Sequence, residues 1–158
     1  MSDRPQRTNT YTAEATSNRY RQCLFDWLAA HAPLWNQITY RRRQAYFSDD
    51  GDVWDAEYTD LYDEYAPVLG KATCQQLARK NSEAWRSHFK LLSQYRDGSN
   101  QAVTERPPPP GYWGNRNEGY ELHGLVRNDL CTFDWNEQRI TLEFGVGDVL
   151  KDWYGFEH

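Results

Sequence analysis

The hydrophobic positions of the first hundred residues follow a helical period. Apolar side chains recur every three or four residues between Tyr20 and Ile38, and Thr16 or Ser17 can cap the helix that they predict. Pro33 lies inside this stripe, so the pattern predicts either one kinked helix or a second helix that starts near the proline.

Two further helices are expected after the turn-forming residues 49–52. Residues 55–65 predict a short acidic helix, which we expect Pro67 and Gly70 to break. Residues 73–95 carry the clearest apolar stripe of the chain, and Asp97-Gly98 supplies a stop signal.

The period changes from 3.6 to 2 in the last third of the chain. Apolar residues alternate with polar ones at 131–135 and again at 140–144, and residues 136–139 between them predict the turn of a β-hairpin. We therefore expect an α+β fold, with an N-terminal bundle of three to four helices followed by a β-hairpin. The expected organisation is a flexible N-terminus at 1–14, a helical region at 15–98, a Pro/Gly linker with an aromatic strap at 99–119, and a hairpin region at 120–158.

Composition supports a folded, intracellular protein. Seven Trp, eleven Tyr and six Phe supply large apolar surfaces for a core in a chain of 158 residues. The three Cys are scattered without a C-x-x-C pair, which predicts buried free thiols and no zinc site. No apolar run has transmembrane length, so we expect a cytoplasmic protein without a membrane partner.

The charges are sorted along the chain. Residues 1–48 hold seven Arg against three acids, residues 49–65 hold eight acids and no base, and residues 71–106 hold seven bases against three acids. Two basic helical segments around an acidic one can bind nucleic acid within an acidic chain of net charge −5. Charge runs are also common on solvated helix faces, and an Arg- and Asp-rich composition suits a salt-loving organism.

Catalytic motifs are weak. Ser87 and His88 are adjacent on a helix and point in different directions, so they cannot form a nucleophile–base pair. Residues 49–55 lack the Gly of a calcium loop, and Gly145-Val146-Gly147 lacks the third Gly of a dinucleotide fingerprint. We expect no metal and no cofactor; paired carboxylates at 49–64 that hold Mg²⁺ for phosphodiester cleavage are a minor alternative.

Binding chemistry is better represented. Three consecutive Arg at 41–43 cover much of a helix circumference, the later helix carries bases on its flanks, and a stiff proline run at 107–110 precedes two aromatic residues that could stack on bases. The predicted nucleic-acid-binding residues are Arg41, Arg42, Arg43, Arg79, Lys80, Arg86, Lys90, Tyr112, Trp113 and Arg116. The ordinary alternative is surface Arg that favours solubility and a strap packed over the core.

Several segments resemble the N-terminal half of TnpB proteins, the insertion-sequence-encoded RNA-guided nucleases that are often described as transposases. The segment Thr73–Phe89 resembles the long helix of that family, and Gly111-Tyr112-Trp113 with Arg116 resembles its glycine-aromatic strap. The resemblance extends upstream to residues 33–36 and 40–46 and downstream to residues 125–130 and 133–145. Tyr-rich, acidic versions of these segments are typical of the haloarchaeal branch.

The resemblance implies a helical recognition region and part of a wedge-type barrel, with guide RNA or a guide–target heteroduplex as the partner. The family's RuvC-like nuclease domain and zinc ribbon have no counterpart in these segments, so we expect a truncated, catalytically inactive protein that could also contact a full-length transposase. The alternative is a small acidic protein-interaction module, in which residues 49–64 and the hairpin bind another protein.

Overall fold

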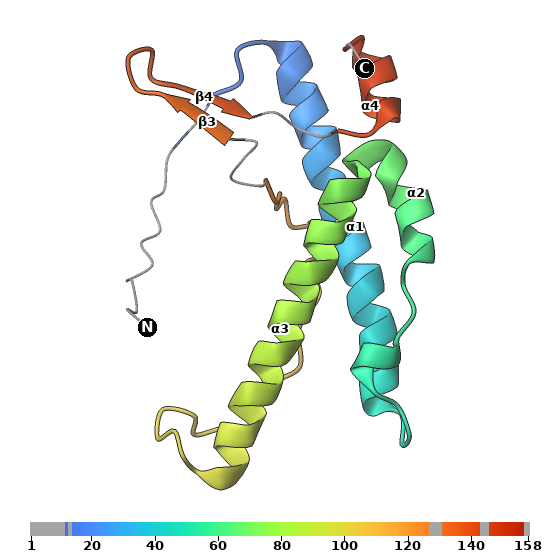
Figure 1. Cartoon of the computed structure of the whole chain (residues 1–158), viewed down its shortest axis with the longest axis vertical. Coiled ribbons are helices and arrows are strands. Elements are labelled where there is room, and N and C mark those ends of the chain that lie inside the picture. Colours follow the sequence, from blue (N-terminus) through green and yellow to red (C-terminus); the bar gives the residue numbers. More distant parts are fainter. Residues whose placement is uncertain (1–11, 13, 127–130, 143–145, 157–158) are drawn as a thin grey trace.

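The described part of the chain forms four α-helices, one short 3₁₀ turn and two small antiparallel sheets (Figure 1). The computed structural model describes residues 12, 14–126, 131–142 and 146–156, so most of the predicted flexible N-terminus lies outside the described residues. The elements are α1 (Asn18–Phe47), η1 (Val53–Asp55), α2 (Asp60–Leu69), α3 (Lys71–Asp97), β1 (Gly114–Asn115), β2 (Gly119–Tyr120), β3 (Cys131–Asp134), β4 (Arg139–Leu142) and α4 (Asp148–Tyr154). This is the predicted α+β fold.

Helix α1 is continuous through Pro33, so the alternative of two separate helices is wrong. The Ser17 side chain caps it by accepting a hydrogen bond from the backbone N–H of Tyr20 at 3.2 Å, as predicted. Pro33 cannot donate to the carbonyl of Ala29, but Ala29 is exposed and its carbonyl can be hydrated. Burial of the neighbouring Ala32 and Leu34 holds the helix together across this point.

The acidic helix begins later and ends later than the sequence predicts. The Asp52 carboxylate accepts from the Trp54 N–H at 3.0 Å and starts the separate 3₁₀ turn η1, after which α2 begins at Asp60. Pro67 lies within the last turn of α2 and does not end it. Gly70 does, because its φ of 81° belongs to the region that favours glycine.

Helix α3 confirms the clearest prediction and extends it by two residues at each end. It ends at Gly98, whose φ of 66° is the left-handed conformation of a helix C-cap. The first half of α3 crosses the middle of α1, and α2 packs against both helices (Figure 1).

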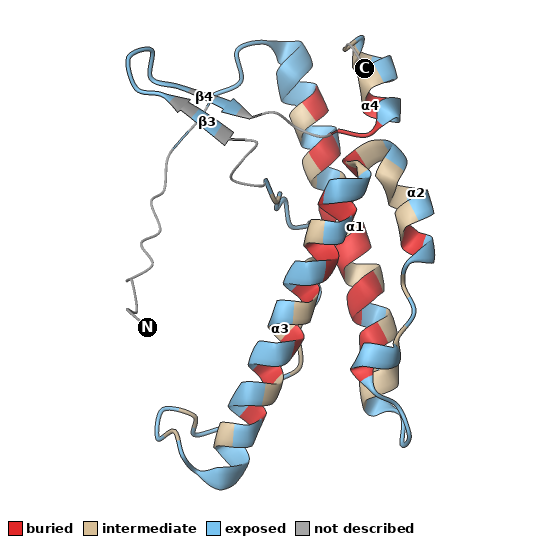
Figure 2. Ribbon diagram, in the orientation of Figure 1, coloured by how far each residue is buried: buried red, intermediate tan, exposed pale blue. Residues whose placement is uncertain are grey.

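The core lies where these three helices meet. Buried residues follow the facing sides of α1 and α3 (Figure 2), and Trp27 of α1 donates its indole N–H to the Leu69 carbonyl at 3.3 Å. Cys23 and Cys74 are buried free thiols, as predicted, and burial raises the pKa of Cys74 to about 11. The side chain of Cys131 lies outside the described part.

The C-terminal region returns to the helices through α4. Leu150 is buried against the core, and the Gly147 N–H donates to the Val68 carbonyl at 2.9 Å. A Cβ at Gly147 would lie 2.0 Å from the Pro67 carbonyl oxygen, so only glycine fits this approach.

The predicted hairpin is present as β3 and β4, which pair antiparallel from Cys131↔Leu142 to Asp134↔Arg139. Parts of the segments 125–130 and 140–145 that the sequence analysis singled out lie outside the described residues. The described strands form two separate two-stranded sheets, and the wedge-type barrel stays a prediction.

Candidate nucleic-acid interface

The three consecutive arginines of α1 point to three different neighbours. Arg41 faces α2, Arg42 faces α3, and Arg43 faces the strap at 107–113. Successive residues of an α-helix are rotated by about 100°, so a triplet distributes its side chains around the helix. None of the three guanidinium groups is left fully exposed.

Arg41 is paired with the acidic segment. Its guanidinium donates to both carboxylate oxygens of Asp60, one of them at 2.8 Å, and to the Glu57 carbonyl at 3.0 Å. The hydrogen bonds from Arg41 lower the pKa of Asp60, and the same contact raises the pKa of Arg41. The acidic block therefore folds back onto one of the predicted phosphate ligands.

Arg42 is a structural residue. Only 3% of its surface is exposed, and its guanidinium donates to the Asn81 side-chain oxygen at 2.8 Å and to the Ser82 hydroxyl at 2.9 Å. It also lies over the rings of Trp54 and Tyr58. Burial lowers its pKa, because the cation loses hydration. The prediction that Arg42 contacts nucleic acid is therefore corrected: its side chain joins α1 to α3 inside the protein.

Arg43 holds the strap and remains partly accessible. It donates to the Pro110 carbonyl at 3.0 Å, and its guanidinium carbon lies 5.5 Å from the ring centroids of both Phe47 and Tyr112. Tyr112 keeps 46% of its surface exposed. These two predicted residues thus come together on one side of α1.

Trp113 anchors the strap to α1. Its ring stacks on Trp35 with centroids 4.2 Å apart and an interplanar angle of 3°, and its backbone N–H donates to the Asn36 side chain at 2.7 Å. The Trp35 indole in turn donates to the Gly111 carbonyl at 2.9 Å. One face of Trp113 is therefore covered by Trp35, and Trp113 packs over the core as the alternative interpretation of the strap expects. The ring of Tyr112 remains accessible to solvent.

Helix α3 carries an exposed basic stripe. Arg79, Arg86 and Lys90 are spaced by seven and four residues, which places them within about 40° of each other around the helix. Glu83 lies at the edge of this stripe, about 60° from Arg86 around the helix, and forms an ion pair at 3.2 Å with Lys80. Lys80 points about 100° away from Arg79. The ion pair between Lys80 and Glu83 therefore leaves Arg79, Arg86 and Lys90 as the bases of the stripe.

Arg86 is held in place by an aromatic neighbour. Its guanidinium carbon lies 5.5 Å from the centroid of Trp54, which the buried Arg42 also contacts. Arg116, the last predicted residue, is exposed in the β1–β2 hairpin. The predicted site residues thus do not form one patch but divide between the α3 stripe and the strap side of α1.

Sequence reasoning missed two exposed rings on the strap side. Tyr40 and Phe47 are 55% and 65% exposed and share one side of α1 with Arg43 at positions i, i+3 and i+7. That spacing was visible in the sequence, but the apolar stripe toward the core is stronger. Whether Tyr40, Arg43 and Phe47 stay exposed depends on where the strap packs, and the strap is distant from α1 in the sequence.

The described residues hold neither a cluster of metal-ligating side chains nor a membrane-spanning helix. Nowhere in that part of the chain do three His, Cys, Asp or Glu side chains gather as possible ligands of a metal ion. Among the helices that the structure describes, none combines the length and the apolar character needed to cross a membrane.

Comparison with known proteins gives one informative match. The chain is 30% identical over 113 residues to the TnpB-like protein ORF457 of Acidianus two-tailed virus, which covers 71% of this chain and 24% of the relative. The chain thus spans about a quarter of the length of the curated relative that it matches. No family model and no solved structure matches the chain. The match supports a relationship to the TnpB family.

Proposed function

We propose that the chain is a transposase-related protein of the TnpB type that binds nucleic acid without cleaving it. The similarity to a TnpB-like protein over 71% of the chain carries this proposal. The expected ligand is guide RNA or an RNA–DNA heteroduplex, because the matching segments resemble the recognition half of the family. The catalytic acids of the family belong to a RuvC-like domain that none of these segments resembles, so the proposal is limited to binding.

The α3 stripe is the surface best suited to a phosphate backbone. Eleven residues separate Arg79 from Lys90, which corresponds to about 16 Å along the helix. Arg forms bidentate hydrogen bonds with phosphate, and the cation–π contact between Arg86 and Trp54 reduces the freedom that binding must remove.

A second function has its own support in the acidic segment. A groove of about 400 Å³ lies between the end of α1 and the loop that follows it, and Tyr40, Asp50, Asp55 and Glu57 are among its lining residues. Acidic and aromatic groups together suit a basic protein segment, which is the alternative of a protein-interaction module.

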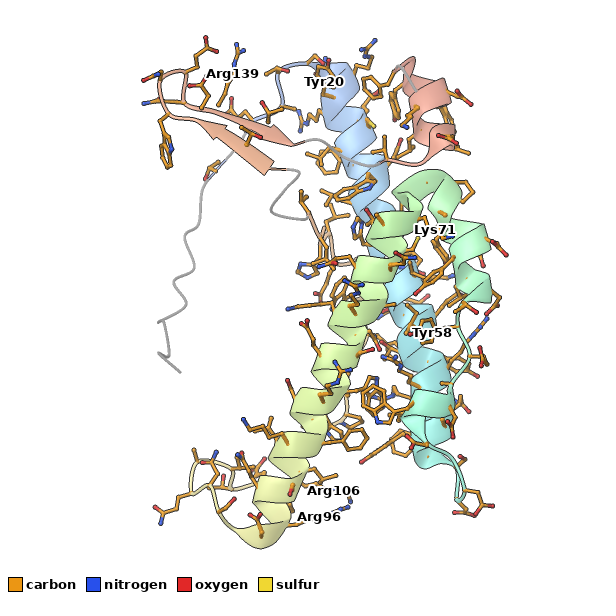
Figure 3. All side chains as sticks on the ribbon, viewed as in Figure 1. Tyr20, Tyr58, Lys71, Arg96, Arg106 and Arg139 are labelled. Carbon is orange, nitrogen blue, oxygen red and sulfur yellow. The ribbon has the colours of Figure 1, made fainter. Side chains whose placement is uncertain are left out.

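Binding of short RNA, DNA and RNA–DNA hybrid duplexes, measured by fluorescence anisotropy, separates the two proposals. Simultaneous Arg79→Gln, Arg86→Gln and Lys90→Gln should weaken binding at least tenfold at low salt. The same change of net charge made at Arg19, Arg21 and Arg139 is the matched control, since the start of α1, marked by Tyr20, and Arg139 lie at the opposite end of the molecule from the end of α3 marked by Arg96 (Figure 3).

The outcomes are distinct. Equal losses in both triple variants would mean that only net charge matters, and no binding by the native chain would refute the nucleic-acid proposal. Incubation of the native chain with Mg²⁺ and each nucleic acid should leave the substrates intact. Cleavage that persists through purification and disappears in a folded Asp50→Asn and Asp52→Asn variant would refute the proposed lack of nuclease activity.

A further inference from the structure

Two exposed rings flank one arginine on the strap side of α1. Phe47 comes from α1 and Tyr112 comes from the strap, and the Arg43 guanidinium lies over both rings. A third exposed ring, Tyr40, lies one helical turn before Arg43, at the border with the acidic groove. We call this set, Tyr40, Arg43, Phe47 and Tyr112, the aromatic surface. Single exposed aromatic residues are ordinary on proteins, but two exposed rings on either side of one cation need an explanation.

The aromatic surface is preorganised. Arg43 is fixed by its hydrogen bond to the Pro110 carbonyl, and the strap that carries Tyr112 is fixed by Trp113, which is stacked on Trp35 and bonded to Asn36. The proline run at 107–110 stiffens the chain just before Tyr112. Arg43 and the backbone that carries Tyr112 are therefore held in place before any ligand arrives, which reduces the entropic cost of stacking beside them.

The chemistry of the aromatic surface selects its ligand. Aromatic rings and a guanidinium plane offer stacking faces, and any nucleobase can stack on them. In a duplex the faces of the bases are covered by their neighbours, so only unpaired bases can use such rings. Arg43 adds a positive charge that can form an ion pair with a nearby phosphate.

We infer that the aromatic surface binds unpaired nucleobases of a single-stranded segment. The α3 stripe contacts only phosphates and therefore does not distinguish single-stranded from double-stranded nucleic acid. This inference rests on the proposed nucleic-acid-binding function and assigns it a ligand class. It adds Tyr40 and Phe47 to the binding residues and gives Arg43 the role of spacing Phe47 from Tyr112.

The test compares single-stranded oligouridine with a blunt RNA duplex of equal length. Phe47→Leu and Tyr112→Leu should each weaken binding of the single strand roughly 5- to 150-fold, the range for loss of one base–aromatic stack, and should change duplex binding by less than about twofold. Tyr95→Leu is the matched control, because Tyr95 is 40% exposed but lies in the last turns of α3. It should leave both ligands unaffected.

A second measurement does not depend on substitutions. Photocrosslinking of the native chain to an oligonucleotide that contains 4-thiouridine, mapped by mass spectrometry, should place crosslinks at Tyr40, Phe47 or Tyr112. Single-strand binding that is insensitive to both ring substitutions, or crosslinks confined to other residues, overturns the inference while the proposed function stands. Absence of binding to every nucleic acid refutes both.

Discussion

The exposure and role of each arginine at 41–43 depend on the residues that pack against its side chain. Arg42 shows this most clearly, because it is buried and its guanidinium contacts Asn81, Ser82 and two aromatic rings. In the sequence alone the three arginines are indistinguishable. The partner of Arg42 lies 39 residues away in the chain, so no local pattern could identify it.

Arg42→Met should destabilise the fold. The substitution leaves the buried side-chain oxygen of Asn81 and the Ser82 hydroxyl without their donor, which costs about 1–3 kcal/mol for an unsatisfied buried group. Chemical denaturation followed by circular dichroism measures the loss of unfolding free energy. The control Arg79→Met, at an exposed position of α3, should stay within about 0.5 kcal/mol of the native protein. Equal effects of the two substitutions would argue against a structural role for Arg42.

The ion pair between Arg41 and Asp60 also gives a prediction at this scale. Asp60→Asn removes the carboxylate that occupies Arg41, so a phosphate can take its place. We expect a few-fold gain in nucleic-acid affinity and a salt dependence that is steeper by about one phosphate contact. Asp63→Asn removes the same charge from the same first turn of α2 and controls for net charge. If both variants gain equally, Arg41 is not the group that is released.

At the scale of elements, the helices could be predicted and their contacts could not. The periodicity of α3 is local information, and its stop at Gly98 follows from the conformational freedom of glycine. The start of α2 was placed too early because the cap by Asp52 diverts the chain into a 3₁₀ turn. The sequence leaves open whether Trp113 stacks on bases or packs over the core, because its partner Trp35 lies on a different element.

A buried histidine ties a late segment of the chain to α1. One ring nitrogen of His31 contacts the Trp27 carbonyl at 2.8 Å, and the other faces the backbone N–H of Leu125 at 3.4 Å. A donor at Nδ1 and an acceptor at Nε2 describe a neutral imidazole. Burial lowers the pKa of His31 below its ordinary value of 6.5, which agrees with that assignment.

This arrangement predicts acid sensitivity. Because the folded pKa of His31 is lower than the unfolded one, the unfolded state binds more protons between the two values, and stability falls as the pH drops below about 6.5. Burial also lowers the pKa of His88, so both residues contribute in the same direction. Denaturation curves between pH 7.5 and pH 5 should show falling unfolding free energy, with a smaller slope in His31→Gln. An unchanged slope in that variant would show that His31 is protonated equally in both states.

At the scale of the whole molecule, the charged segments of the sequence lie on different surfaces. The acidic segment lies against α1, where Asp60 pairs with Arg41, while Arg79, Arg86 and Lys90 of α3 remain exposed. The basic sectors therefore survive on two sides of the crossed helices. The net charge of −5 describes neither of them.

Nucleic-acid binding through phosphate contacts of Arg79, Arg86 and Lys90 should show in the salt dependence of the affinity. The quantity to measure is the slope of log K against log salt concentration, for the native chain and for the variant with glutamine at these three positions. We predict strong salt dependence for the native chain and a slope reduced in magnitude by about two to three in the variant, since each lost phosphate contact removes close to one. Identical slopes for the two proteins, with both folded, would refute binding through these three residues.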